Sequence, residues 1–336
     1  MTAARPVAQA PKPGTSHVAA FDLLRVTAIL FIVLFWHVRG YHDDALPLFL
    51  YPGRILVNGM LAVLVFISGV LLSRYQFPGD SPWQFYRNRM LRIYPLFALA
   101  LLLMWGCGLV KDEALLPSLL LSNMINGEPL LTLWFVTLIM LFYLVTPLLL
   151  WRYQRSRFAV IALLLTVAVF TAHLQLGWFD KRLAIYLPCY LLGLACGREA
   201  ALHQLWRSWP LALAGALFAV LALVRSGPQP VTSLFGGDAS QNLWASVIGG
   251  LLLIASYYWA AERLTPLVAG PVLAWLSYTS FALYLFHRPV FVLIDSWIDP
   301  QTVITTWLWL AGVGGPIALL TSWLLQRASD RLFARR

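Results

Sequence analysis

Charge is scarce in this sequence: 11% of its 336 residues are charged, whereas 60% are hydrophobic. A soluble domain typically carries about 25% charged residues, so the scarcity excludes a water-soluble globular domain. It indicates that a lipid bilayer surrounds most of the chain. The net charge is +10, but the basic residues lie singly or in small clusters between apolar runs. This distribution argues against a nucleic-acid-binding surface, and we expect no nucleic-acid partner.

Cysteine is also scarce, and the three residues, Cys107, Cys189 and Cys196, all lie in apolar runs. The sequence has no CxxC pair and no Cys/His spacing typical of zinc ligands. We therefore expect neither a disulfide framework nor a metal centre. A cleavage site of small residues is missing after the first apolar run, which contains Asp22 and Arg25. We interpret that run as a retained membrane helix rather than a signal peptide.

Long apolar runs are abundant, and a membrane-spanning helix needs about 20 such residues. The sequence predicts an all-α integral membrane protein with about ten transmembrane helices. A shorter apolar segment, 115–125, is expected to lie at the membrane interface or to re-enter the membrane. The ten predicted spans are residues 18–37, 55–73, 93–110, 130–150, 158–176, 182–197, 209–225, 243–261, 271–293 and 302–325.

Basic residues are distributed unequally between the two predicted sides. With the N-terminus inside, sixteen of the 24 Lys and Arg residues fall in inside segments and seven in outside segments. Cytoplasmic loops are enriched in basic residues, so both termini are expected to be cytoplasmic. We expect a disordered tail over 1–16, a single transmembrane domain over 17–326 and a basic tail over 327–336. The extramembrane stretches are too short to fold alone.

Three ionisable residues in the first span are candidates for function, because buried charges are costly in a membrane. Asp22 and Arg25 are three residues apart, so they share a helix face and can pair. His37 lies about 18 Å further along a helix than Arg25, near the far side of the membrane. The alternative is that Asp22 and Arg25 only cap and anchor the helix, while His37 lies among lipid headgroups.

Three arginines, Arg87, Arg89 and Arg92, lie at a predicted junction between a cytoplasmic loop and a helix. Guanidinium groups present fixed forks that suit phosphate oxygens. A cytoplasmic donor with several phosphates, such as an acyl-coenzyme A, would suit this cluster. The alternative is anchoring of the helix by contacts with lipid headgroups.

A late segment, SYTSFALYLFHRP (277–289), contains the second notable histidine. His287 lies near the end of an outward-running helix, at a depth similar to that of His37. Two histidines at one level can form a catalytic pair or a proton relay; the alternative is one interfacial histidine that binds headgroups. Polar residues that recur near helical spacing predict a supporting stripe on the same helix: Tyr278, Ser280 and Tyr284.

Taken in order, these elements resemble acyltransferase family 3, whose members modify cell-surface glycans. The resemblance extends over nearly the whole membrane region. Besides the first helix it rests on FISGVLLSRY (66–75), RNRMLRIYP (87–95), LWFVTLIMLFYLVTP (133–147) and SYTSFALYLFHRP. It implies ten core helices, a coenzyme A thioester donor, most commonly acetyl-CoA, and acylation of a sugar hydroxyl. The acceptor would be a polysaccharide or a lipid-linked saccharide at a bacterial inner membrane, with lipid and polysaccharide-synthesis proteins as further partners.

The resemblance also implies roles for individual residues. His37 would be the catalytic histidine, Arg25 its companion and His287 the late-helix histidine. Arg89 and Arg92 match an R-x-x-R donor motif. In the resulting hypothesis His37 deprotonates a sugar hydroxyl or briefly takes the acyl group itself. Predicted sugar contacts on the outer side are Trp134, Tyr41, Asp43 and Asp44.

Two departures from the family pattern are visible. Eleven residues separate Arg25 from His37, where the family usually has ten. On a regular α-helix the extra residue would turn His37 by about 100°, and a π-bulge would absorb it. Ile139 and Met140 stand where the larger branch of the family has a Glu pair, so the chain resembles the compact branch without an added periplasmic domain.

Two other classes of function remain as alternatives. A transporter or flippase for a lipid-linked sugar would use the same buried polar residues as a pathway. The absence of an internal repeat and of matching interrupted helices weighs against it. A scaffold subunit of a polysaccharide synthase would not need the histidines for chemistry.

Overall fold

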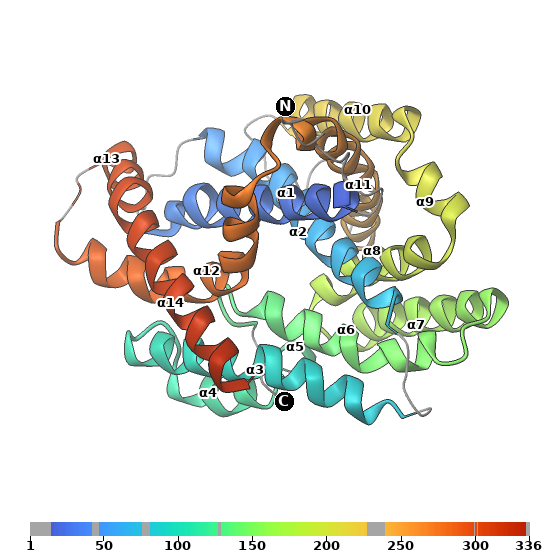
Figure 1. Ribbon diagram of the computed structural model, residues 1–336, viewed down its shortest axis with the longest axis horizontal. Coiled ribbons are helices and arrows are strands. Elements are labelled where there is room, and N and C mark those ends of the chain that lie inside the picture. Colours follow the sequence, from blue (N-terminus) through green and yellow to red (C-terminus); the bar gives the residue numbers. More distant parts are fainter. Residues whose placement is uncertain are drawn as a thin grey trace, which may run out of the picture.

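A computed structural model describes the chain in seven stretches. Within them the chain forms helices joined by turns and loops, without any strand, so the predicted all-α fold is confirmed (Figure 1). Asp43 and Asp44, two of the predicted sugar contacts, lie outside the described residues. The described stretches are 15–41, 47–75, 81–126, 129–226, 239–298, 300 and 302–333.

Each of the ten predicted spans overlaps a long helical element, because each apolar run is long enough to satisfy its backbone groups as a helix. The first and last spans both contain a π-helical turn. The elements are α1 (Thr15–Phe31) with η1 (Ile32–Trp36), α2 (Pro47–Ser73), α3 (Trp83–Gly106), α6 (Trp134–Leu150), α7 (Arg155–Leu176), α8 (Lys181–Arg198), α10 (Trp209–Ser226), α11 (Ala239–Val268), α12 (Pro271–Asp295), and α13 (Val303–Trp309) with η5 (Leu310–Gly314) and α14 (Gly315–Phe333).

Short elements connect the long ones. The predicted short segment 115–125 forms parts of two small helices, α4 (Asp112–Leu119) and α5 (Asn123–Asn126). The 3-10 turn η2 (Val38–Tyr41) follows η1, and α9 (Ala200–Trp206) precedes α10 at a bend of 45°.

Six of the described helical spans are long and apolar enough to cross a membrane, or seven if the bent α9–α10 pair forms one span. The ten crossings and the cytoplasmic placement of both termini therefore stay predictions. Helix α6 is apolar but has only 17 residues. Helix α12 is not among the six, and it buries polar side chains inside the protein, among them Thr279 and His287.

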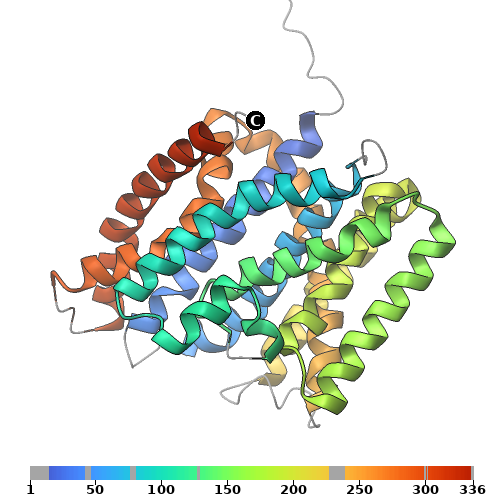
Figure 2. The same ribbon diagram turned by 90° about the horizontal axis from the view of Figure 1, so that it is seen from below.

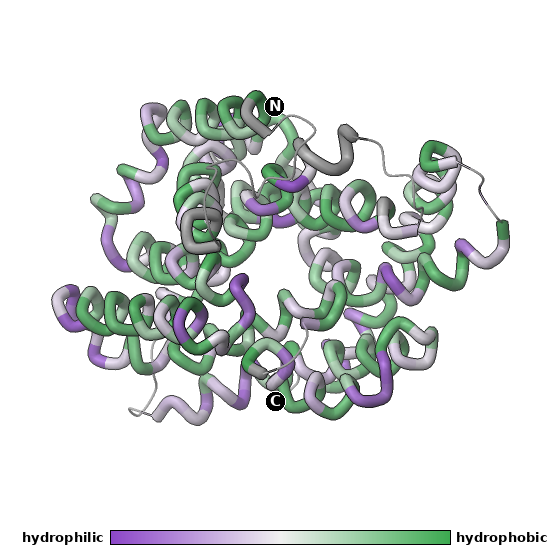
Figure 3. The backbone as a smooth tube through the Cα atoms, turned by 180° about the vertical axis from the view of Figure 1, so that it is seen from behind, coloured by the Kyte–Doolittle hydropathy of each residue, from purple (hydrophilic) through white to green (hydrophobic). Residues whose placement is uncertain are grey.

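Helix α1 lies inside the bundle and packs against α12, α11 and α2 (Figures 1 and 2). Helices α2 and α8 approach closely because Gly69 and Gly193 leave no side chain at their crossing. By contrast, α7 lies at the edge of the bundle and buries few of its residues. Hydrophobic residues run along most of the helices (Figure 3). This surface suits a lipid environment.

Candidate active site

Two histidines that are 250 residues apart in the chain meet between α1 and α12. Nδ1 of His37 lies 2.9 Å from Nε2 of His287. Their rings are parallel within 2°, with centroids 4.9 Å apart. His287 is fully buried and His37 is half-buried. We call these two residues the histidine pair; the structure brings together the residues that the sequence placed at similar depth.

The π-helix η1 determines where His37 points. The backbone N–H of His37 donates to the carbonyl oxygen of Ile32, five residues earlier, at 2.8 Å. A regular α-helix would bond four residues back, so one residue has been absorbed between Arg25 and His37. Of the two outcomes that the sequence left open, a rotated His37 or a π-bulge, the structure has the π-bulge, which absorbs the extra residue.

Backbone carbonyls determine which nitrogen of His287 carries a proton. Its Nδ1 lies 3.1 Å from the carbonyl oxygen of Leu283 and 2.9 Å from that of Tyr284. Because a carbonyl oxygen only accepts, Nδ1 of His287 donates and its Nε2 accepts. In the neutral pair His37 therefore donates from Nδ1, and its Nε2 carries the lone pair. That nitrogen is suited to act as a base.

Arg25 lies in a second polar cluster on the same two helices. Its Nη1 is 3.5 Å from Oδ1 of Asp22 and donates to Oγ of Ser277 at 3.0 Å. The hydroxyl of Ser277 donates in turn to Oδ1 of Asp22 at 2.6 Å. The predicted Asp22–Arg25 pair is confirmed, and α12 contributes the third member.

Segments that are distant in sequence meet beside this cluster. Tyr143 of α6 lies near Ser68 of α2, and its ring lies 6.4 Å from that of Phe85 on α3. The guanidinium of Arg89 lies 5.7 Å from the centroid of Phe85. Tyr143 interacts electrostatically with three arginines, Arg89, Arg92 and Arg25. We call five residues the arginine end of the α1–α12 contact: Asp22 and Arg25 of α1, Ser277 of α12, and Arg89 and Arg92 of the neighbouring α3.

A family model of the acyltransferase domain of family 3 matches residues 18–327, nearly the whole chain. The chain belongs to acyltransferase family 3. No curated protein and no solved structure matches it significantly. With its several apolar helices, this acyltransferase is a multi-pass membrane protein.

Aromatic side chains surround the histidine pair of the acyltransferase. The ring of Tyr284 lies 6.3 Å from that of His37 and 6.2 Å from that of His287. Its hydroxyl donates to the carbonyl oxygen of Thr132 at 2.6 Å. Phe291 packs edge-on against His287 at 5.6 Å. Such fixed, largely apolar walls keep the two imidazoles in one arrangement.

Trp134, a predicted sugar contact, begins α6 next to this aromatic wall. Its ring stacks on Tyr186 at 6.1 Å, and the guanidinium of Arg182 lies 4.5 Å from it. The neighbouring Phe135 packs against Tyr284 at 5.6 Å. The structure therefore places Trp134 close to the residues around the histidine pair.

Tyr41, another predicted sugar contact, lies just beyond η1. Its hydroxyl donates to the carbonyl oxygen of Arg288 at 3.4 Å, and its ring packs edge-on against Phe291 at 6.1 Å. Burial raises the pKa of Tyr41 to about 12, against the opposing charge of Arg288. At neutral pH Tyr41 is therefore a hydrogen-bond donor.

The three predicted supporting residues of α12 do not share one location. Tyr284 adjoins the histidine pair. Ser280 is buried and donates to the carbonyl oxygen of Ser277 at 2.7 Å. Tyr278 is 41% exposed, and its hydroxyl donates to Oδ2 of Asp330 on α14 at 2.6 Å. Tyr278 is thus remote from the polar face that the sequence assigned to it.

The three predicted donor-binding arginines differ in exposure. Arg87 and Arg92 are exposed on α3, whereas Arg89 is half-buried. Nε of Arg89 is buried and has no hydrogen-bond partner among the described residues. A buried donor without an acceptor is costly, and an anionic ligand oxygen would satisfy it.

Sequence reasoning missed three polar residues at the arginine end: Ser68, Tyr143 and Ser277. All three lie in segments that carry the family resemblance, FISG, LFY and SYTS. Each is a polar residue in an apolar run, which is the signal that pointed to Arg25 and His37.

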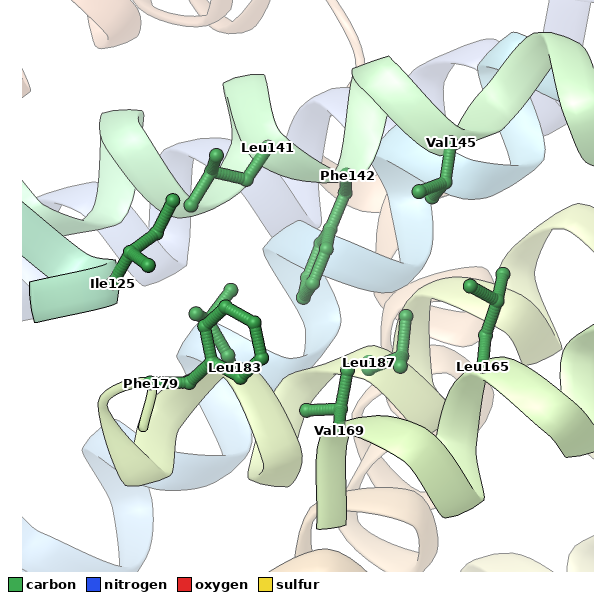
Figure 4. A pocket seen from close by; sticks show the side chains of 9 residues that line it. All are labelled: Ile125, Leu141, Phe142, Val145, Leu165, Val169, Phe179, Leu183 and Leu187. Carbon is green, nitrogen blue, oxygen red and sulfur yellow. The ribbon is translucent and has the colours of Figure 1, made fainter. Parts of the chain in front are cut away.

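An apolar cavity of about 150 Å³ lies between α6, α7 and α8 (Figure 4). Every lining side chain is apolar, so the cavity offers no group for acid–base chemistry and is not part of the candidate site. The lining residues are Ile125, Leu141, Phe142, Val145, Leu165, Val169, Phe179, Leu183 and Leu187.

Proposed function

We propose that this membrane acyltransferase moves an acyl group, most commonly acetyl, from an acyl-coenzyme A to a sugar hydroxyl. The acceptor is a cell-surface polysaccharide or a lipid-linked saccharide, and the enzyme lies in a bacterial inner membrane with both termini in the cytoplasm. The observation that carries the proposal is the histidine pair. Its hydrogen-bond order supports a lone pair on Nε2 of His37, and activation of a hydroxyl requires such a base.

The arginine end supports the choice of a phosphate-bearing donor. Arg25, Arg89 and Arg92 act on one region around Tyr143, and guanidinium groups bind phosphate oxygens by paired hydrogen bonds. The partnerless Nε of Arg89 would find its acceptor there. A donor held at this end must extend about 18 Å, the rise of twelve helical residues, for its thioester to reach His37.

The chemistry then follows from the order of hydrogen bonds. Nε2 of His37 removes the proton of the acceptor hydroxyl while its oxygen attacks the thioester carbonyl carbon. The new C–O bond forms and the C–S bond breaks. The departing thiolate then takes from Nε2 of His37 the proton that came from the acceptor hydroxyl. Meanwhile Nε2 of His287 accepts from Nδ1 of His37, which stabilises the positive charge on that ring. Attack on the thioester by His37 itself, followed by transfer to the hydroxyl, uses the same nitrogen.

Purified enzyme in liposomes tests the proposal with labelled acetyl-coenzyme A and a lipid-linked or polymeric glycan. The wild-type protein should transfer label to the glycan, and His37→Ala should abolish transfer. His173→Ala is the matched control, because His173 contacts the carbonyl oxygen of Phe179 and not the pair. Full transfer by His37→Ala would overturn the assignment. Movement of lipid-linked sugar without donor consumption would indicate a transporter. A wild-type protein that transfers no label, and that binds polysaccharide-synthesis proteins equally well with and without His37→Ala, would indicate a scaffold.

A further inference from the structure

A second π-helix packs against the one that carries His37. The turn η5 joins α13 to α14 at one edge of the bundle (Figure 1). Residues of η5 contact both η1 and α12. Two π-turns from opposite ends of the chain therefore lie together beside the histidine pair.

One side chain from this last span bonds directly to η1. Nε1 of Trp307, on α13, donates to the carbonyl oxygen of Leu34 at 2.8 Å. Leu34 lies inside η1, three residues before His37. Gly315 packs so closely on Leu34 that an added Cβ would lie 2.8 Å from Cδ2 of the leucine. The last span thus holds Leu34 by both its carbonyl group and its side chain.

The same span also supports the other histidine. Gly314 packs on Phe291, where an added Cβ would lie 3.1 Å from the ring. Phe291 in turn packs edge-on against His287 at 5.6 Å. The segment from Trp307 to Gly315 therefore touches the supports of both members of the pair.

The hydrogen bond from Trp307 to Leu34 matters because the residues of η1 could also adopt α-helical geometry. If η1 returned to α-helical geometry, His37 would turn by about 100° and lose its contact with His287. We propose that Trp307 is a positioning residue whose indole N–H holds η1 in the register that places His37 against His287. This inference rests on the proposed function of the histidine pair and adds a residue that does not itself touch the reacting atoms.

Trp309 provides a matched control two residues away. Its Nε1 donates to the carbonyl oxygen of Ile294 at 3.2 Å, near the end of α12 and away from η1. Trp307→Phe and Trp309→Phe therefore each remove one indole donor from α13, but only the first removes a bond to η1.

Kinetics in liposomes separate positioning from general destabilisation. Trp307→Phe should lower kcat about tenfold, because small displacements of a reacting group are costly. The KM for acetyl-coenzyme A should stay within about twofold, since the arginine end is about 18 Å away along α1. Trp309→Phe should leave both constants within about twofold. An unchanged kcat in Trp307→Phe, or equal losses in both variants, would overturn the inference.

A double-mutant cycle with His287→Ala supplies a second readout. If Trp307 acts by placing His37 against His287, Trp307→Phe should lower kcat no further once His287 is gone. A full additional tenfold loss would show an independent structural role. His37→Ala, measured in parallel, keeps the two proposals apart: full activity of that variant contradicts the proposed function. An inactive His37→Ala with a wild-type Trp307→Phe contradicts only this inference.

Solid-state NMR of ¹⁵N-histidine-labelled protein tests the geometry without any activity. A coupling across the hydrogen bond between Nδ1 of His37 and Nε2 of His287 should be present in the wild type and in Trp309→Phe. It should be lost or markedly weakened in Trp307→Phe. Its persistence in Trp307→Phe would overturn the inference whatever the enzyme transfers.

Discussion

The two polar ends of the α1–α12 contact are built differently. At one end His287 is fully buried and bonds to a single partner side chain, His37. At the other, the side chains of Arg25 and Asp22 are 31% and 24% exposed, and Ser277 bridges them. The buried end has a defined tautomer, whereas the exposed end presents charge. This contrast fits the proposed roles, in which the histidine pair reacts and the arginine end binds the donor.

The contrast also predicts how each end responds to substitution. Removing one partner of a buried hydrogen bond leaves the other unsatisfied, which lowers the free energy of unfolding by about 1–3 kcal/mol. A partly exposed ion pair such as Asp22–Arg25 contributes about 0–1 kcal/mol to the free energy of unfolding. Changes at the histidine pair should therefore alter kcat strongly, and changes at the arginine end should alter donor binding more modestly.

After His37→Ala, which should abolish transfer, His287→Ala is expected to have the largest effect. It removes the acceptor that orients His37 and stabilises its charged form, so kcat should fall by about 10²-fold or more. The KM for acetyl-coenzyme A should stay within about twofold. His173→Ala, a histidine substitution remote from the pair, should behave as wild type. A loss expressed mainly in donor KM would contradict the division between the two ends.

Arg89→Ala should have the next largest effect. It should change the KM for the donor rather than kcat. Loss of a charge-assisted contact should raise the KM for acetyl-coenzyme A about tenfold, while kcat changes less than threefold. Arg89→Lys should recover only part of the affinity, because an ammonium lacks the planar fork. Arg87→Ala, on the exposed part of the same helix, is the control and should raise KM less. Equal effects of the two alanine variants would indicate general attraction by positive charge.

Much of the fold, and part of the candidate site, was predictable from the sequence. The ten apolar runs predict helices because their lengths match a bilayer, and all ten overlap helices. Counting residues between Arg25 and His37 reveals the extra residue that the π-turn absorbs, although the count alone left a rotated His37 equally open. The tautomer was not predictable, because it depends on carbonyl groups of α12 that lie against Nδ1 of His287. Ser68 and Tyr143 were missed because a polar residue in an apolar run does not reveal its partner.

Tyr278 did not belong in the predicted polar stripe, and helical geometry itself separates it from Tyr284. It lies six residues before Tyr284, and six residues turn an α-helix by about 240°. The two tyrosines therefore cannot share one face, and Tyr278 instead donates to Asp330 on α14. Ser280 and Tyr284 are four residues apart and both are buried.

Ser277→Ala should have the smallest measurable effect, at the arginine end. The hydroxyl of Ser277 accepts from Arg25 and donates to Asp22, so its loss weakens the orientation of the guanidinium. Because the partly exposed pair can recruit water, we expect a rise in donor KM of about two- to fivefold, or ~0.5–1 kcal/mol, with kcat unchanged. Ser280→Ala is the matched control, since that buried hydroxyl donates to a backbone carbonyl and touches neither charge. A fall in kcat for Ser277→Ala alone would mean that the two ends are coupled along α12, and their separation into binding and reacting groups would be wrong.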